Sequence, residues 1–140
     1  MLNIFIGYDS RETVAYHVLS HSIMRRASGP ISITPLILDQ LRSMGVYTRE
    51  RLSIESTEFS LTRFLCPFLC DFKGLSLFMD CDMLCQTDLC TLAIDVPYPI
   101  SVCKHDYVPR STTKFLGQAQ TVYPRKNWSS FMLFNNEKCR

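Results

Sequence analysis

Two aspartates, one residue apart, interrupt an apolar stretch of this chain. Asp80 and Asp82 follow the run "LSLFM" within "GLSLFMDCDML". Residues two apart in an extended chain project to the same side, so the two carboxylates are predicted to converge on one point. Like charges that close repel each other unless a cation or a proton lies between them. Carboxylate oxygens are ligands that suit Mg²⁺ or Mn²⁺, and a cation with open positions binds phosphate oxygens well.

The surrounding elements are predicted to form a sheet that gathers polar strand ends at one edge. Apolar runs predict strands over 2–7, 31–39, 74–84, 100–107 and 129–136, and helical spacing predicts helices over 8–30 and 56–72. This alternation predicts an α/β fold with a mostly parallel sheet flanked by helices. Ligands of such sheets lie outside the carboxyl ends of the strands, which here carry Tyr8-Asp9, Asp80 to Asp82, and His105-Asp106.

Two prolines refine this outline. Pro35 lies in the second predicted strand, and proline cannot donate to a sheet ladder, so this strand is predicted at an edge or a bulge. Pro67 lies inside the helix predicted over 56–72, where it is expected to cause a kink.

The bulk composition is that of an ordinary soluble domain. The chain has 140 residues, of which 46% are apolar and 20% charged, enough for one domain with a real core. The net charge of +2, without a basic stripe, predicts neither a nucleic-acid partner nor a membrane surface. The apolar start over 2–7 is too short for a signal peptide, and no stretch reaches membrane-spanning length, so a cytoplasmic location is expected.

The seven cysteines favour a structural interpretation. They lie mostly in apolar stretches, which is typical of small buried hydrophobic residues in a reducing compartment. Cys66 and Cys70 could share one helix face and bind a metal, but their spacing is not that of the usual zinc sites. We therefore expect no cysteine metal site.

Several segments together resemble the glycosyltransferases of the GT-A fold, in particular those of family 8, the glycogenin-like and bacterial lipooligosaccharide galactosyltransferases. "GLSLFMDCDML" resembles their Asp-x-Asp segment, and Asp9 in "IFIGYDS" matches an aspartate that contacts the nucleotide base. Arg63, ahead of Pro67 in "FSLTRFLCPFL", matches an arginine that reaches the donor sugar. Ser129 and Ser130 in "NWSSFMLFNN" match a turn of small residues before an apolar strand. The matches follow the family's order along nearly the whole chain.

Three departures from the family pattern accompany these matches. Glu12 stands where the family has a tyrosine, which leaves Tyr8 as the residue able to stack on a base. Trp128, Ser129 and Ser130 replace the family's smaller turn residues. The family's third metal ligand, a histidine followed by glycine, has no counterpart before Arg140. Residues 1–140 are therefore expected to be a single GT-A-like nucleotide-sugar-binding domain, the N-terminal part of a longer catalytic domain, with little activity alone.

The resemblance implies a reaction and a set of site residues. The reaction is metal-dependent transfer of a sugar from a nucleotide-diphosphate sugar, with a UDP-sugar favoured, to a hydroxyl of a sugar, lipid or protein acceptor. Asp80 and Asp82 would bind Mn²⁺ or Mg²⁺, with Asp82 as the more direct ligand. The implied donor-binding residues are Tyr8, Asp9, Arg63, Asp80, Ser129 and Ser130. Family 8 implies retention of configuration, and no catalytic nucleophile is identified.

Plainer interpretations of some of these residues stay open. Asp9 is equally suited to capping the helix that follows it. Arg63 could be a surface arginine whose stem covers an apolar helix. His105 and Asp106 are adjacent on a strand, so they point to opposite faces and are expected to act structurally or on the acceptor side.

The Asp-x-Asp pattern is also compatible with two other classes of protein. A haloacid-dehalogenase-type phosphohydrolase would use Asp80 as nucleophile and Asp82 as acid and base. In that class a threonine or valine usually stands where this chain has Leu84, and the motif ends the first strand instead of the third. The second alternative is a non-catalytic nucleotide-binding fragment that only binds partners.

Overall fold

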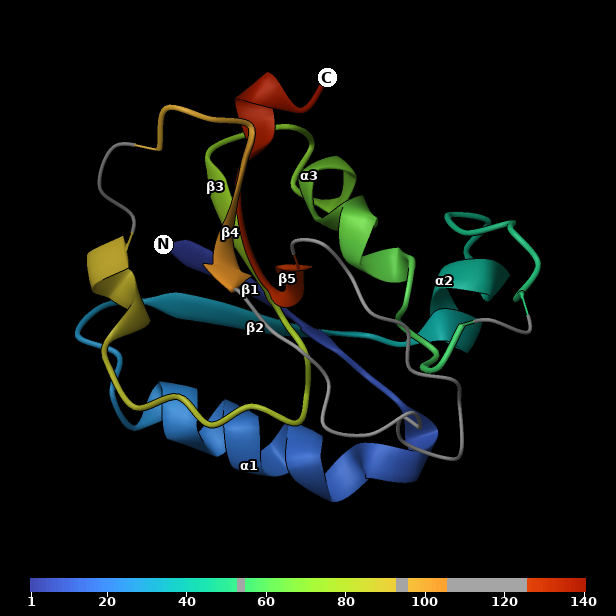
Figure 1. Cartoon of the computed structure of the whole chain (residues 1–140), viewed down its shortest axis with the longest axis horizontal. Coiled ribbons are helices and arrows are strands. Elements are labelled where there is room, and N and C mark those ends of the chain that lie inside the picture. The colour runs from blue at the N-terminus through green and yellow to red at the C-terminus, as the bar shows by residue number, and fades with distance from the viewer. Residues whose placement is uncertain (53–54, 93–95, 106–125) are drawn as a thin grey trace.

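The computed structural model describes residues 1–52, 55–92, 96–105 and 126–140 (Figure 1). It contains the strands β1 (Leu2–Gly7), β2 (Ile31–Leu36), β3 (Leu75–Met79), β4 (Ile100–His105) and β5 (Lys126–Asn135), and the α-helices α1 (Thr13–Met24), α2 (Leu38–Ser43) and α3 (Cys66–Leu69). Single 3-10 turns at Ser10–Glu12 and Thr62–Leu65 lead into α1 and α3. Further 3-10 turns lie at Leu89–Leu92 and Asn136–Lys138.

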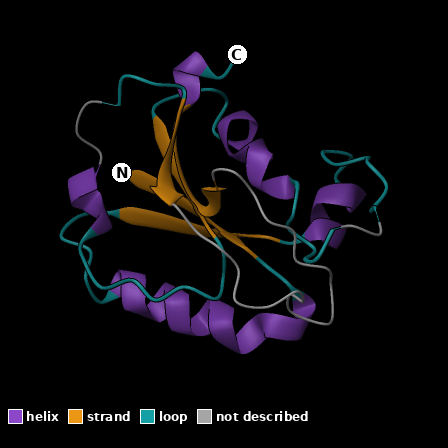
Figure 2. Ribbon diagram, in the orientation of Figure 1, coloured by secondary structure: helices purple, strands orange, loops and turns teal. Residues whose placement is uncertain are grey.

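The five strands form one open sheet in the order β2-β1-β3-β5-β4 (Figure 2). β1 pairs in parallel with β2 and with β3, whereas β5 is antiparallel to both β3 and β4. It follows that β1 to β4 share one direction and β5 runs against them. The predicted α/β fold with a mostly parallel sheet is confirmed, and Pro35 lies in the edge strand β2, as predicted.

Helices cover both faces of the sheet (Figure 1). α1 lies along one face, where its Leu19 and Ile23 are buried. α3 lies on the other face, and its C-cap residue Cys70 accepts a hydrogen bond from Asn3 of β1, with 3.7 Å between Nδ2 and Sγ. The central strands β1 and β3 contribute fully buried side chains such as Ile4, Ile6 and Phe78. Burial from both sides explains why these two strands read as largely apolar runs, each with a single polar residue, Asn3 or Ser76.

The structure corrects several expected element bounds. β2 ends at Leu36 and not at residue 39, and residues 38–43 form α2, the short helix that was predicted within the loop over 40–56, because Leu38 and Leu41 turn into the core. The continuous helix predicted over 56–72 is instead a 3-10 turn followed by the short α3. Pro67 does not kink a helix but lies in the first turn of α3, where its missing N–H is not needed.

Candidate functional site

The Asp-x-Asp segment begins where β3 ends. The backbone N–H of Asp80 donates to the carbonyl of Ser130 in β5 at 2.8 Å, one residue past the last strand residue, Met79. The chain then turns at Cys81 and Asp82, so the prediction that the strand continues to residue 84 is wrong. Asp80 is half-buried and Asp82 is exposed. The two carboxylates therefore meet different surroundings.

Arg63 is buried and faces the Asp-x-Asp segment. Only 7% of its surface is exposed, so its interpretation as a surface arginine is wrong. Its Nη1 donates to the carbonyl and to the hydroxyl of Ser129, at 2.7 and 2.9 Å, and its Nη2 lies 3.2 Å from Oδ1 of Asp80. The guanidinium carbon lies over the rings of Phe59 and Phe78, 5.6 and 4.9 Å from their centroids. The structure thus brings together Arg63, Asp80 and Ser129, three of the residues that the resemblance to family 8 implies for donor binding.

The cluster has hydrogen-bonding capacity left over. Among the described residues, Nε of Arg63 and Oδ1 of Asp80 are buried and have no hydrogen-bond partner. The 3.2 Å contact between Arg63 and Asp80 is therefore an ion pair without hydrogen-bond geometry. Buried polar atoms without partners are uncommon because each one costs free energy. A donor and an acceptor thus remain unused on adjacent side chains.

The carboxylates around Asp80 make its charge unfavourable. Burial, against the lowering effect of Arg63 and together with the charges of Asp82 and Glu12, raises the pKa of Asp80 to about 6. Burial also raises the pKa of Glu12, with Asp82 as the next cause. Glu12 additionally accepts a weak hydrogen bond from the thiol of Cys81, at 3.7 Å between Sγ and Oε2. Three acidic side chains therefore disfavour one another in one region.

The side chains of the Asp-x-Asp segment fit a hard divalent cation only if a bound ligand supplies further oxygen atoms. Asp80 and Asp82 supply carboxylate oxygens, and Oδ1 of Asp80 is free of hydrogen bonds. Within the described ranges, no group of three or more His, Cys, Asp or Glu side chains is arranged to bind a metal. Mg²⁺ commonly uses one or two carboxylates together with substrate phosphates. The residues present fit that pattern, and do not fit an all-protein metal cage.

Asp9 is fully engaged by hydrogen bonds from Arg11, two residues on, and from the distant Glu58. It is buried, and it accepts hydrogen bonds from the backbone N–H and Nε of Arg11 at 3.1 and 2.7 Å and from the backbone N–H of Glu58 at 3.1 Å. The side-chain hydrogen bond from Arg11 is the main reason why the pKa of Asp9 is lowered to about 2. These contacts are those of the capping alternative, and the base contact of Asp9 stays a prediction.

The remaining predicted site residues lie at the same edge of the sheet. Tyr8 follows β1 and shares a hydrogen bond with the hydroxyl of Thr13 at 2.9 Å. Ser130 offers its carbonyl to Asp80, as described above. His105 ends β4, and Asp106 lies outside the described residues. No contact described for these residues tests their predicted functions.

Sequence reasoning missed the aromatic support of Arg63. Phe59 is buried beneath the guanidinium, and a Cβ on Gly7 would lie 2.4 Å from its ring. Phe59 lies in a turn ahead of the 3-10 turn that carries Arg63, so helical spacing in the sequence could not indicate this contact. The close approach of Phe59 to Gly7 left no signal in the sequence.

All seven cysteines are free, but only three of them are buried, so the interpretation as buried hydrophobic residues holds for part of the set. Cys66, Cys81 and Cys85 are buried, and burial raises the pKa of the Cys81 thiol to about 12. None of the described helices combines the length and the apolar character that crossing a bilayer requires.

Comparison with known proteins places this geometry in a glycosyltransferase-like fold. The structure resembles the bifunctional glycosyltransferase WbbM in its apo form with a TM-score of 0.62 and 13% identity, over 98% of this chain and 32% of that one. It also resembles the apo form of the glycosyltransferase GlyE of Streptococcus pneumoniae TIGR4 with a TM-score of 0.54 and 15% identity, over 97% of this chain and 34% of that one. At these identities the likeness concerns the fold, and membership of family 8 stays a prediction.

The sequence itself has a much nearer relative. Protein CDI of Arabidopsis thaliana is 54% identical over 134 residues, which cover 94% of this chain and 52% of that protein. The chain thus spans about half the length of this relative. No family model matches the chain.

Proposed function

We propose that this chain forms the donor-binding part of a glycosyltransferase, which transfers a sugar from a nucleotide-diphosphate sugar to an acceptor hydroxyl. The observation that carries the proposal is the buried cluster of Arg63, Asp80 and Ser129 at the carboxyl end of β3. Ligands of open α/β sheets lie outside the carboxyl ends of the strands. The glycosyltransferase-like fold supports the same assignment.

In this proposal the unused atoms of the cluster receive the donor. Arg63 is fixed by Ser129 and Asp80 through its Nη atoms, so its Nε remains a donor for a sugar hydroxyl. Oδ1 of Asp80, the atom that faces Nη2 of Arg63 in the ion pair, makes no hydrogen bond and is the acceptor that the cluster offers. Groups held in place before a ligand arrives lose little entropy on binding, which makes them effective in positioning a reacting sugar.

The exposed Asp82 and the half-buried Asp80 are the residues that would bind Mn²⁺ or Mg²⁺. Such a cation stabilises the negative charge that develops on a diphosphate leaving group. Its positive charge would also offset the repulsion between carboxylates that adds to burial in raising the pKa of Asp80 and of Glu12. We propose UDP as the nucleotide, with Tyr8 and Asp9 in contact with its base. For the protein we propose a cytoplasmic location.

Nucleotide release provides the test. The chain is incubated with UDP-glucose or UDP-galactose, with and without Mn²⁺, and the released UDP is measured for the native sequence and for Asp82→Ala. We expect release that requires both Mn²⁺ and Asp82, at the low level expected of part of a longer catalytic domain. Binding of UDP without any release would favour the non-catalytic alternative. An aspartyl-phosphate analogue trapped on Asp80 with fluoride would favour the phosphohydrolase and contradict the proposal.

A further inference from the structure

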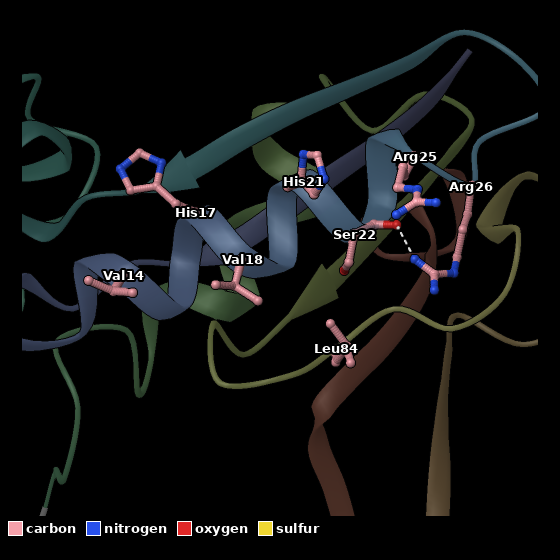
Figure 3. Close-up of a pocket in the computed structure, with 8 residues that line it drawn as sticks. All are labelled: Val14, His17, Val18, His21, Ser22, Arg25, Arg26 and Leu84. Carbon is pink, nitrogen blue, oxygen red and sulfur yellow. Dashed lines mark hydrogen bonds between the residues drawn. The ribbon is translucent and has the colours of Figure 1, made fainter.

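A groove on the outer face of α1 lies apart from the cluster around Arg63 (Figure 3). Its volume is about 520 Å³, and it is lined by Val14, His17, Val18, His21, Ser22, Arg25, Arg26 and Leu84. Val14, Val18 and Leu84 are exposed by 76%, 51% and 57%. Two apolar side chains of α1 and one from the segment after β3 are thus left in water, which indicates a surface that gains free energy when it is covered.

The second wall of the groove is fixed to the helix. The backbone N–H of Cys85 donates to the hydroxyl of Ser22 at 3.0 Å, and this hydroxyl donates to the carbonyl of Leu19 at 2.8 Å. These two bonds hold Leu84 beside α1, where Figure 3 shows it facing the helix. The apolar side chains therefore form a preformed concave surface.

The charged residues that line this groove are both basic. Arg25 and Arg26 lie at its C-terminal end, and His17 and His21 flank the valines on the same helix (Figure 3). No acidic residue is among those that line the groove, and none occurs in the sequence of α1 from Thr13 to Met24. A second copy that presented the same face would bring like charges together, so self-association through this groove is disfavoured.

We propose that this groove binds an amphipathic helix of a partner protein, with apolar side chains over Val14, Val18 and Leu84 and carboxylates toward Arg25 and Arg26. From Val14 to Arg25 the groove follows α1 for roughly 16 Å, about three helical turns, which suits a helix laid into it. A helix also matches the concave shape better than a flat lipid surface does. The surface is separate from donor binding, so the proposal does not depend on the glycosyltransferase assignment.

Two synthetic peptides provide a direct test. Each has 18 residues with leucine at every third or fourth position, and the intervening residues are mainly glutamate in one peptide and lysine in the other. Nitrogen-15 correlation spectra of the chain are recorded during titration with each peptide. We expect the glutamate peptide to shift the amides of α1 and Leu84 saturably, and the lysine peptide to leave them unchanged. Absence of a saturable shift, or equal shifts with both peptides, would overturn the proposal.

Variants of the chain separate charge from packing. In the double variant Arg25→Glu, Arg26→Glu, the affinity for the glutamate peptide should fall roughly tenfold and the lysine peptide should bind, because two attractions become repulsions. Arg42→Glu with Arg49→Glu, away from the groove, changes the net charge equally and should have no such effect. Val18→Ser keeps all charges and should still weaken binding. Sedimentation with phosphatidylcholine–phosphatidylserine vesicles that is lost in the Arg25 and Arg26 double variant would assign the surface to lipid and overturn the proposal.

Discussion

Arg63 keeps a positive charge in surroundings almost closed to water. Burial is the main cause that lowers its pKa, and the charge of Asp80 acts in the opposite direction. The planar guanidinium meets this situation with two hydrogen bonds to Ser129, an ion pair to Asp80 and two aromatic rings. A lysine ammonium is a compact point charge and cannot reproduce the fork geometry or the stacking.

Arg63→Lys is therefore expected to reduce the free energy of unfolding by about 1–3 kcal/mol, because hydrogen bonds to a buried charged group are lost. Urea denaturation measures this change. The matched control is Arg42→Lys on α2, where Arg42 is exposed and makes one contact, to the carbonyl of Arg49. We expect the control to stay within about 0.5 kcal/mol of the native sequence. Equal stability of both variants would contradict the buried role of Arg63.

Asp9 makes the stability of the fold depend on pH. Its pKa is lowered from 3.8 to about 2, so the folded state binds the proton less tightly than the unfolded chain does. The stabilisation is present above the unfolded value and is lost as pH falls from about 4 to about 2. Asp9→Asn removes this stabilisation. The difference in free energy of unfolding between the native chain and the variant should therefore be larger at pH 6 than at pH 2, by up to about 2.5 kcal/mol.

Chemical denaturation of native and Asp9→Asn chains across this pH range measures the effect. Asp39→Asn on α2 replaces an exposed aspartate and provides the control. Its difference from the native chain should not vary with pH in the same way. A constant difference for Asp9→Asn from pH 2 to pH 6 would show that its hydrogen bonds with Arg11 and Glu58 do not stabilise the ionised form.

At the scale of elements, the end of β1 and the segment before α3 support each other. Gly7 closes β1, and Phe59 packs so tightly against it that a Cβ would lie 2.4 Å from the ring. Phe59 in turn lies beneath the guanidinium of Arg63. The absence of a side chain at residue 7 is therefore what allows the aromatic support of Arg63 to reach its position.

Gly7→Ala should displace Phe59 and destabilise the fold by about 1–3 kcal/mol, the usual range for overpacking a core. It should also move the Nε–H resonance of Arg63 in a nitrogen-15 spectrum. Gly29→Ala is the matched control, because a Cβ there meets only the sulfur of Cys90 at 3.9 Å. If Gly7→Ala is as well tolerated as Gly29→Ala, the packing of Phe59 on β1 is not what positions Arg63.

The elements that the sequence predicted best are those with one dominant signal. β1 and β3 are buried on both faces, so their apolar runs are unambiguous, and α1 has clear helical spacing. The segment before α3 could not be predicted in the same way. Its apolar residues Phe64 and Phe68 are exposed by 52% and 53%, whereas the charged Arg63 is buried. Which face turns inward depended on partners from β3 and β5, and one sequence does not show such distant contacts.

At the scale of the whole molecule, residues far apart in the sequence meet at one edge of the sheet. Arg63 precedes α3, Asp80 follows β3, and Ser129 lies in β5, which runs against the other strands. The resemblance to family 8 implied that these three residues serve one donor site, and that role stays a prediction. The sequence did not predict that β3 would stop at Met79, because strand patterning cannot show the turn at Cys81 and Asp82. The candidate site thus depends on the entire sheet.

The most direct test is calorimetric titration of the chain with UDP in the presence and absence of Mn²⁺. The proposed function predicts saturable binding that requires Mn²⁺. Asp82→Ala should abolish this binding without changing the melting temperature, because Asp82 is exposed and contributes little to the fold. Asp39→Ala, also exposed, should bind as the native chain does. Affinity for UDP that is equal with and without Mn²⁺, or unchanged in Asp82→Ala, would contradict the metal-assisted donor site at the end of β3.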